Sequence, residues 1–317
     1  MNDLQQLAQA VIQWGALTLL FVVGISVLII VVLYFIDKTQ TTQTIRRNYP
    51  VVGRFRYLFE HLGGFLRQYF FAMDREELPF NRAERSWVYR AAKNVDTTIA
   101  FGSTRPLNQE GEAMFLNSAF PTLSEEIAEP KPITVGAGSC KKPYTTKSVI
   151  NVSGMSYGSI SAPAIRALSN GAREAGIWMN TGEGGLSPYH LEGGCDIVYQ
   201  IGTAKYGVRN LDGTLSDDKL REVSAHEQVR MFEIKMSQGA KPGKGGILPA
   251  IKVTEEISRI RGIPVGTDSI SPNGHEDIKN VSDLLDMIQR IREVTGKPVG
   301  FKLVVGQLEF FDDLLQE

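Results

Sequence analysis

The sequence predicts an α/β protein of the (β/α)8 TIM-barrel type, preceded by one transmembrane helix. Three observations lead to this prediction. An uncharged apolar run occupies residues 14–36. From residue 148 onward, short β-favouring runs alternate with amphipathic segments, which is typical of βαβ units and a parallel sheet. Polar, glycine-rich segments follow several of these runs, at the position where parallel α/β proteins bind ligands.

Residues 14–36 predict the transmembrane helix. Thr18 and Ser26 are the polar residues of this 23-residue run, which is long enough to span about 30 Å of hydrocarbon. Trp14 and Tyr34 lie near its ends, where aromatic side chains favour the membrane interface. The alternatives are a cleaved signal peptide and a buried helix. A signal peptide would have a basic segment before the run and a clear small-residue cleavage site, and a buried helix rarely needs such an unbroken apolar run.

The charges around this run predict its orientation. Asp3 is the charged residue before it, and five basic residues follow it closely: Lys38, Arg46, Arg47, Arg54 and Arg56. The positive-inside rule therefore places residues 1–13 outside and the rest of the chain in the cytoplasm, as a single-pass membrane protein. The basic cluster serves as a flank of the span, and it could also bind the anionic headgroups of the lipid bilayer.

Residues 37–147 predict a cytoplasmic linker and barrel-packing region of short helices and loops. Prolines interrupt its polar second half at residues 121, 130 and 132. Its aromatic residues are expected to pack in a core or near the membrane. They are Tyr57, Phe59, Phe65, Tyr69, Phe70 and Phe71.

The first βαβ unit of the barrel region follows. Residues 149–152 predict a strand, and Ser161 caps a helix that Gly176 ends. Residues 177–179 predict the second strand. A loop at 180–185 then leads into an insertion that contains the apolar run 197–201.

The later elements are expected as follows. Ser216 caps a long amphipathic helix that Lys235 closes and Gly239 breaks. Residues 264–272 predict a strand and loop. A helix over residues 282–294 and a strand over residues 299–304 complete the pattern.

An open doubly wound sheet and a barrel both remain compatible with this pattern. Gly136-Ala-Gly138 lacks the third glycine of a dinucleotide-binding turn. The glycines and lysine of residues 239–244 have the wrong spacing for a P-loop. The placement of the polar segments therefore favours the barrel. About four strand–helix units precede Glu317, so we expect residues 148–317 to form the N-terminal half of a barrel.

Composition excludes several other classes. The 317 residues include 34 basic and 35 acidic side chains, so the net charge of −1 does not favour nucleic acid as a partner. Cys140 and Cys195 have no further Cys or His at metal-ligand spacing. A metal site, an iron–sulfur cluster and a disulfide framework are therefore not supported.

Several side chains in the barrel region suit a flavin and a dicarboxylate. An inward Lys302 could stabilise the anionic reduced flavin, or could be a salt-bridged core lysine. Residues 155–158 could pass under the flavin ring, or form only a tight turn. Glu183 could be a site carboxylate or a loop-ordering group, and His275 a structural or an acidic group. A basic cluster could bind a dicarboxylate or simply face solvent: Lys235, Gln238, Lys241 and Lys244.

The barrel region resembles the synthase domain of the glutamate synthase family over roughly residues 148–304. Its ordered motifs are GMSYGSIS, NTGEGG, KYGV, EIKMSQGAKPGKGG, LPAIKVTEEISRIRGIP, DSISPNGHEDI and GFKLV. The apolar run together with IRRNYPVVGRFRYLFE resembles the short, membrane-anchored branch called FMN-binding glutamate synthase family proteins. The set is far more specific than any one motif.

The resemblance implies an FMN-dependent (β/α)8 barrel that reduces 2-iminoglutarate, formed from 2-oxoglutarate and ammonia, to L-glutamate. It implies that the FMN contacts are Met155, Ser156, Tyr157, Gly158, Gln238 and Lys302. It assigns catalysis to Lys235 and Glu183. It assigns 2-oxoglutarate binding to Lys235, Lys241 and Gly182.

Departures from the family pattern shape the expected partners. No amidotransferase domain precedes the barrel region, and the iron–sulfur cysteines of the family are absent from this sequence. Free ammonia or a separate glutaminase subunit would supply nitrogen. The electron donor is unknown, and a separate reductase subunit is one candidate. A fragment of a longer protein, or a chain that needs a second polypeptide to close the barrel, is expected. Two alternatives stay open: an FMN oxidoreductase with another substrate, and a non-catalytic tethered module.

Overall fold

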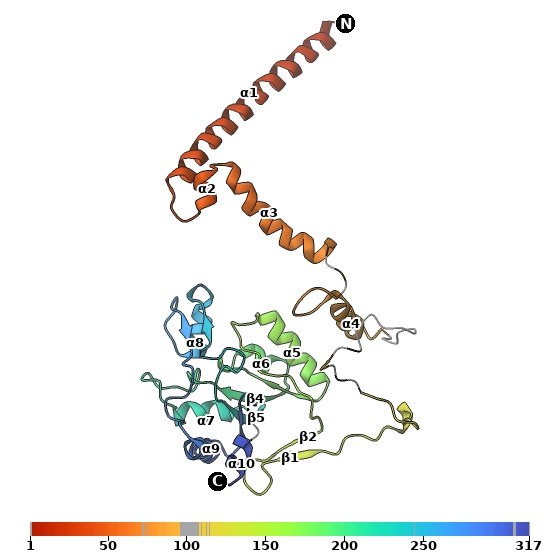
Figure 1. Cartoon of the computed structure of the whole chain (residues 1–317), viewed down its shortest axis with the longest axis vertical. Helices are drawn as coiled ribbons and strands as arrows, with labels where there is room; N and C mark the ends of the chain where they lie inside the picture. The colour runs from red at the N-terminus through yellow and green to blue at the C-terminus, as the bar shows by residue number, and fades with distance from the viewer. Residues whose placement is uncertain are drawn as a thin grey trace. The chain divides into compact units, whose positions relative to one another are not determined.

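The computed structural model (Figure 1) describes residues 2–71, 73, 75–95, 108, 110–111, 113, 115–243, 245–306 and 309–316. The chain divides into two compact units, Met1–Leu116 and Asn117–Glu317. The finer division of the sequence at residues 13, 36 and 147 stays a prediction.

The described part of the first unit is helical. Within its first helix, Gln9–Thr39 is long and apolar enough to cross a membrane by length and composition. This segment includes the predicted span at residues 14–36. The elements of the unit are α1 (Asn2–Thr39), α2 (Thr44–Asn48), α3 (Val52–Leu66), a π-helical turn (Arg67–Phe71) and α4 (Arg82–Ala92).

Asp37 joins the first three helices. Its fully enclosed carboxylate lies 2.7 Å from Arg46 Nη2 and 2.8 Å from Arg54 Nη2. The backbone N–H of Val51 donates to the same carboxylate at 2.9 Å. Arg46 belongs to α2 and Arg54 to α3, so one charge at the end of α1 fixes the start of α3 beside it.

The second unit is built on a four-stranded sheet with the strand order β3-β4-β5-β8. All neighbouring strands of this sheet are parallel. The strands are β3 (Trp178–Asn180), β4 (Asp196–Ile201), β5 (Val229–Lys235) and β8 (Val299–Lys302). Two short antiparallel pairs lie outside it: β1 (Ile133–Val135) with β2 (Tyr144–Thr146), and β6 (Ile247–Leu248) with β7 (Ser269–Ile270).

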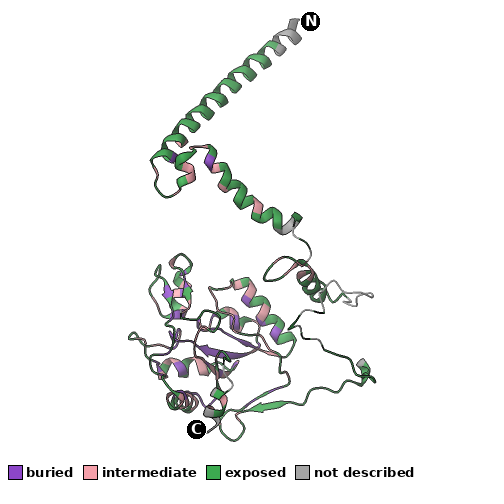
Figure 2. Ribbon diagram, viewed as in Figure 1, coloured by how far each residue is buried: buried purple, intermediate pink, exposed green. Residues whose placement is uncertain are grey.

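Helices cover one face of the parallel sheet and complete the core. Alternate strand residues, including Tyr199 and Phe232, pack against Ile165, Leu220 and Ile291 of three helices. Figure 2 shows these buried residues along the strands and the inner sides of the helices. The helices that the structure describes in the second unit are α5 (Ala162–Glu174), α6 (Pro188–Glu192), α7 (Asp217–Ala225), α8 (Glu255–Arg261), α9 (Val281–Thr295) and α10 (Glu309–Gln316), with 3-10 turns at Ser124–Glu126 and Ala250–Lys252.

The predicted long helix from Ser216 to Lys235 is wrong. The structure has the helix Asp217–Ala225 followed by the strand Val229–Lys235. The segment Val229-Arg-Met-Phe-Glu-Ile-Lys alternates between the two faces of the sheet, and Phe232 and Ile234 are buried on the helix side. A period of two over seven residues therefore outweighed the helical pattern that precedes it.

Two further strand predictions need correction. Residues 149–152 form no strand, although Val152 makes an isolated parallel bridge to Met179. In the predicted strand at 264–272, only Ser269–Ile270 is extended, and it pairs antiparallel with β6 rather than joining the parallel sheet. The apolar run at 197–201, read as part of an insertion, belongs instead to strand β4 between β3 and β5.

The remaining elements agree with the sequence. The strand predicted at 177–179 overlaps β3, the strand predicted at 299–304 contains β8, and the helix capped by Ser161 is α5. The helix predicted at 282–294 is α9, which ends at Gly296 with a φ of 71°. The mixed α/β class with a parallel sheet is thus established, while closure of the sheet into a (β/α)8 barrel stays a prediction.

Candidate functional site

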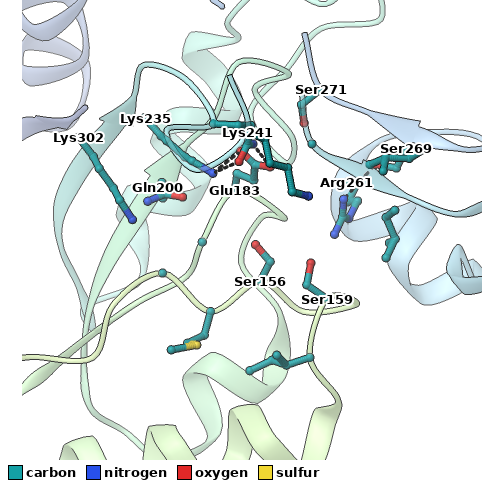
Figure 3. A pocket seen from close by; sticks show the side chains of 18 residues that line it. Ser156, Ser159, Glu183, Gln200, Lys235, Lys241, Arg261, Ser269, Ser271 and Lys302 are labelled. Carbon is teal, nitrogen blue, oxygen red and sulfur yellow. Dashed lines mark hydrogen bonds and ion pairs between the residues drawn. The ribbon is translucent and has the colours of Figure 1, made fainter. Parts of the chain in front are cut away.

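A cavity of about 260 Å³ lies at the carboxyl ends of the parallel strands. Its wall includes Gln200 from β4, Lys235 from β5 and Lys302 from β8. The loop after β3 adds Gly182 and Glu183. Figure 3 shows these side chains converging on the same space as Ser156, Ser159 and Arg261.

Glu183, Lys235 and Gln238 form a hydrogen-bonded cluster in this wall. Lys235 Nζ lies 3.1 Å from Glu183 Oε2 and donates to Gln238 Oε1 at 2.8 Å. Gln238 Nε2 donates to both carboxylate oxygens of Glu183, at 2.7 and 2.8 Å. The side chains of Lys235 and Glu183 are each 17% exposed, so the pair is partly desolvated yet open to a ligand.

Lys235 and Lys302 are register partners at the ends of β5 and β8. Among the residues that the structure describes, the side chains of Lys302 and Lys241 make no ion pair or hydrogen bond. Glu183 supplies the only carboxylate found in the described wall of the cavity. Like charges on neighbouring strands repel, so this wall is suited to an anion.

Arg261 adds a buried cation on another side of the cavity. It is 4% exposed, and its Nη1 donates to Ser269 Oγ at 2.9 Å while Nη2 donates to the carbonyl of Tyr157 at 3.2 Å. Its Nε has no hydrogen-bond partner among the described atoms, and it makes no salt bridge there. Burial lowers the pKa of Arg261, yet a guanidinium stays protonated, so its charge calls for an anionic ligand.

Three glycines let the backbone form the cavity wall. Gly182 has a φ of +65°, and a Cβ there would meet Ser156 Oγ at 2.4 Å. A Cβ on Gly246 would meet Glu183 Oε1 at 2.7 Å, and one on Gly154 would meet the Gly182 Cα at 3.2 Å. A side chain at Gly182 would displace the backbone of the Met155–Ser156 segment, and one at Gly246 would displace the end of the Glu183 side chain.

A partly buried carboxylate, that of Glu233, orients the floor of the cavity. Glu233 Oε1 accepts from Asn180 Nδ2 at 3.0 Å and from Gln200 Nε2 at 2.6 Å. Asn180 Oδ1 in turn accepts from the N–H of Gly182 at 2.9 Å. The chain of bonds ties the loop after β3 to the middle of the sheet, because Glu233 lies on β5.

The Met155–Gly158 loop is fixed by its carbonyl groups. His190 Nε2 lies 2.9 Å from the Met155 carbonyl oxygen, and His190 Nδ1 accepts from the N–H of Ser187 at 3.1 Å. An accepting Nδ1 leaves the proton on Nε2, which then donates to Met155. Burial lowers the pKa of His190 and thereby favours this neutral form.

Most of the residues predicted for the site line this cavity. They are Met155, Ser156, Gly182, Glu183, Lys235, Gln238, Lys241 and Lys302. Tyr157 and Gly158 are not among its lining residues. The Tyr157 hydroxyl donates to Glu256 Oε2 at 2.5 Å, and burial raises the pKa of this tyrosine. A Cβ on Gly158 would meet Ile257 Cδ1 at 3.0 Å, so this glycine packs against α8.

Two other predicted residues have different positions. His275 is buried and its Nε2 lies 3.0 Å from the Lys235 carbonyl oxygen, so it supports the backbone of the cavity wall without lining it. Burial lowers the pKa of His275. Lys244 lies outside the residues that the structure describes.

Sequence reasoning missed Arg261, Gln200 and Ser269, which all line the cavity. A usable signal existed for Arg261. It follows Ile257 by four residues in α8 and therefore shares the face of that buried isoleucine, where a cation needs a partner. Gln200 is a polar residue inside an apolar strand run, which is a similar signal.

The fold and the site together define an α/β protein with a cationic, glycine-walled cavity at the ends of parallel strands. Comparison with protein families identifies the class more closely. The model described as a conserved region in glutamate synthase matches residues 98–310. The chain belongs to the glutamate synthase family.

Individual relatives agree with this assignment. The glutamate synthase large subunit-like protein YerD of Bacillus subtilis is 38% identical over 335 residues, which cover 93% of this chain and 63% of the relative. An archaeal-type glutamate synthase (NADPH) of Thermotoga sp. is 47% identical over 151 residues, which cover 47% of this chain and 27% of the relative. A glutamate synthase large subunit-like protein of Rhizobium meliloti is 31% identical over 230 residues, which cover 71% of this chain and 49% of the relative. The chain thus spans less than two thirds of each of these relatives.

Proposed function

We propose that this chain is the membrane-anchored part of an FMN-dependent oxidoreductase of the glutamate synthase type, which forms L-glutamate from 2-oxoglutarate and ammonia. The observation that supports it best is the cavity at the strand ends, where Lys241, Lys302 and Arg261, which have no carboxylate partner among the described residues, face one Glu183–Lys235 pair. A dianionic substrate and a phosphorylated cofactor both suit such a cavity.

The residues of the cavity fit FMN. Gly154, Gly182 and Gly246 keep part of the wall free of side chains, so the backbone there could approach a flat ring closely. Lys302 and Gln238 would hold the polar edge of the ring, with Met155 and Ser156 against its face. When bound, FMN supplies the hydride that reduces an imine.

Lys235, Lys241 and Arg261 would bind the two carboxylates of the substrate. Their positions on different elements, the end of β5, the following loop and α8, suit a dicarboxylate whose ends lie apart. Gly182 would approach the substrate through its backbone. The substrate carboxylates would then offset most of the positive charge of the site. Such pairing is favourable in a partly desolvated cavity, because an unpaired charge there is costly.

Glu183 and Lys235 would act next to the reacting carbon. Their hydrogen bond links a proton donor to a proton acceptor, and Gln238 holds both side chains in one orientation. A positioned acid–base pair typically accelerates a reaction by about a hundredfold or more. We assign the proton that accompanies the reduction to this pair.

The same proposal includes the cellular setting. Helix α1 would anchor the chain in the lipid bilayer, with residues after the span in the cytoplasm. A separate glutaminase, or free ammonia, would supply nitrogen, and a separate reductase would supply electrons. Further strands would complete the barrel around the open side of the sheet.

Flavin binding and glutamate formation test the proposal. The chain is purified in detergent and titrated with FMN, and the flavin absorbance near ~450 nm is recorded. Dithionite then reduces the flavin, and L-glutamate is measured after addition of 2-oxoglutarate and ammonium. The same assays use a fusion to the C-terminal barrel segment of the Bacillus relative.

The expected result is FMN binding by the chain or by the fusion, and ammonium-dependent glutamate formation that Lys235→Met abolishes. Lys252→Met is the matched control, since Lys252 is exposed and does not line the cavity. FMN binding without glutamate would favour another substrate. Failure of both proteins to bind FMN would refute the proposal.

A further inference from the structure

Helix α3 has one apolar face that no described part of the first unit covers. Successive residues of a helix are 100° apart, which places the large apolar side chains of α3 within one arc. The residues that form this face are Phe55, Leu58, Phe59, Leu62 and Leu66. Each of these side chains is between 40% and 65% exposed.

The opposite face of α3 is polar or glycine-rich. Arg56 and Glu60 form an ion pair at 2.9 Å on it, and Gly53 and Gly64 lie on the same side. Gly53 is buried against α2, where an added Cβ would lie 3.0 Å from the Ile45 carbonyl oxygen. Contact with α2 therefore uses the glycine side of α3 and not its apolar side.

The Asp37 cluster fixes where this apolar face begins. Asp37 lies near the end of α1, and Arg54 in the first turn of α3 binds its carboxylate through Nε and Nη2 at 2.8 Å each. The start of α3 is thus held at the end of the candidate membrane span Gln9–Thr39. The start of α3 therefore lies at the level of the lipid headgroups if α1 spans the bilayer.

The charges nearby also suit a membrane surface. Asp37 is neutralised by two arginines, so it adds no free negative charge. Lys38 and Arg47 are exposed and make no ion pair among the described residues. Each basic residue near an anionic membrane adds about 1 kcal/mol of attraction.

We propose that α3 lies in the interface of an anionic phospholipid bilayer, with the Phe55–Leu66 face in the lipid and the Gly53–Gly64 face toward the protein and solvent. The proposal rests on the membrane anchor proposed above. Amphipathic helices bind in this way when their apolar face enters the boundary between headgroups and acyl chains. The anchor and α3 together would hold the chain at two points of one membrane.

Fluorescence quenching on the full chain tests the proposal. The chain is reconstituted in nanodiscs of phosphatidylcholine and phosphatidylglycerol, in a Cys140→Ser background, while Cys195 is 1% exposed and escapes labelling. An environment-sensitive fluorophore is attached at Leu62→Cys or Phe59→Cys on the apolar face. Gly64→Cys is the matched control, because an added Cβ there meets nothing within 4 Å.

We expect lipid-borne nitroxide to quench the labels at residues 59 and 62 about threefold more than the label at 64, because only the apolar face enters the lipid. Aqueous iodide should show the reverse order. Equal iodide quenching at all three positions would overturn the proposal, and so would protection of residues 59 and 62 from both quenchers, which would mean that protein covers this face.

A label at Ile25→Cys separates failure of α3 from failure of the anchor. If α1 spans the bilayer, nitroxide deep in the acyl chains quenches this label, whatever α3 does. Quenching at residue 25 without quenching at 59 and 62 overturns the α3 proposal alone. No quenching at residue 25 overturns the anchor, and the α3 proposal with it. Circular dichroism of each variant checks that its helix content is unchanged.

Discussion

Lys235 and Lys302 are neighbours in register at the carboxyl ends of two parallel strands, β5 and β8. Only Lys235 has a carboxylate partner among the described residues, namely Glu183 at 3.1 Å. Two adjacent ammonium groups with one carboxylate leave a positive charge at the strand ends. An anion bound there relieves the repulsion, so ligand binding and local stability are coupled.

Lys302→Met should therefore stabilise the protein without ligand and weaken the binding of FMN. Removing one of two like charges on neighbouring strands should raise the free energy of unfolding by about 0.2–1 kcal/mol. Urea unfolding in the absence of flavin measures the stability, and titration with FMN measures the affinity. Lys252→Met should change neither. A variant that loses stability and keeps its FMN affinity would contradict this account of Lys302.

Gly182→Ala should abolish FMN binding. The φ of +65° at this position is unfavourable for alanine, and the new Cβ would lie 2.4 Å from Ser156 Oγ. The Met155–Gly158 loop would have to move away from the cavity. The measurement is flavin retention after gel filtration.

Gly171→Ala is the control for this substitution. Gly171 lies in α5 and has open space around it, so alanine should stabilise the helix by about 0.5–1 kcal/mol and leave flavin binding unchanged. Retention of FMN by Gly182→Ala would show that close approach of this loop does not matter for the cofactor.

Arg261→Met should raise the KM for 2-oxoglutarate. A hydrogen bond to a charged group contributes about 1.5–3 kcal/mol, so its loss should raise the KM roughly 10- to 150-fold. Arg261→Lys should restore part of the affinity, because it keeps the charge and loses the paired geometry. Steady-state kinetics of both variants measure the effect.

The control for this prediction is Arg259→Met, since Arg259 is exposed in the same helix. Its KM should stay at the value of the unaltered chain. Arg261 also holds the Tyr157 carbonyl and Ser269, so unfolding by urea must be measured beside the kinetics. An unchanged KM in a folded Arg261→Met protein would exclude this residue from substrate binding.

The free energy of unfolding should fall as the pH decreases below about 6.5, the ordinary pKa of histidine. Burial lowers the folded-state pKa of both His190 and His275. Below 6.5 the unfolded chain therefore takes up protons that the folded chain does not. At pH 7.5 both histidines are neutral in both states, and their stabilising hydrogen bonds are complete.

Urea denaturation between pH 5 and 7.5 tests this pH dependence. His190→Gln should lower stability at pH 7.5 and show a shallower loss on acidification, because one of the two titrating groups is gone. The exposed His61 offers a control, since His61→Gln should keep the slope of the unaltered chain. An equal slope in His190→Gln would mean that His190 is not the neutral, buried donor to Met155.

The sequence predicted the class of fold better than its strands. Helices α5 and α9 have clear caps at Ser161 and Gly296, and these local signals agree with the structure. Strand β5 was missed, because residues 229–235 follow a helical segment with only a short turn between them. Pairing with β4 and β8 on both sides decides its conformation, and pairing is not visible in a local pattern.

The candidate site was predicted where chemistry and backbone requirements appear in one short motif. Glu183, Lys235 and Gln238 stand in glycine-rich segments, and the structure brings them within hydrogen-bond distance. Arg261 was missed, because it sits in an ordinary amphipathic helix and reaches the cavity only through the packing of α8. Tyr157 stands in a predicted motif, yet its side chain binds Glu256 instead.

The segment from Ile247 to Ile270, which is part of the connection between β5 and β8, affects how such a site can diversify. It contains β6, α8 and β7 and has its own small core of Leu248, Val253 and Ile257. Strands β5 and β8 pair directly with each other, so the sheet does not depend on this excursion for its hydrogen bonds. Mutation or exchange of this segment can remodel the Arg261 side of the cavity, while Lys235 and Lys302 keep their places on the sheet. New ligand preferences are thus accessible to evolution, and to grafting experiments, through a segment of about two dozen residues.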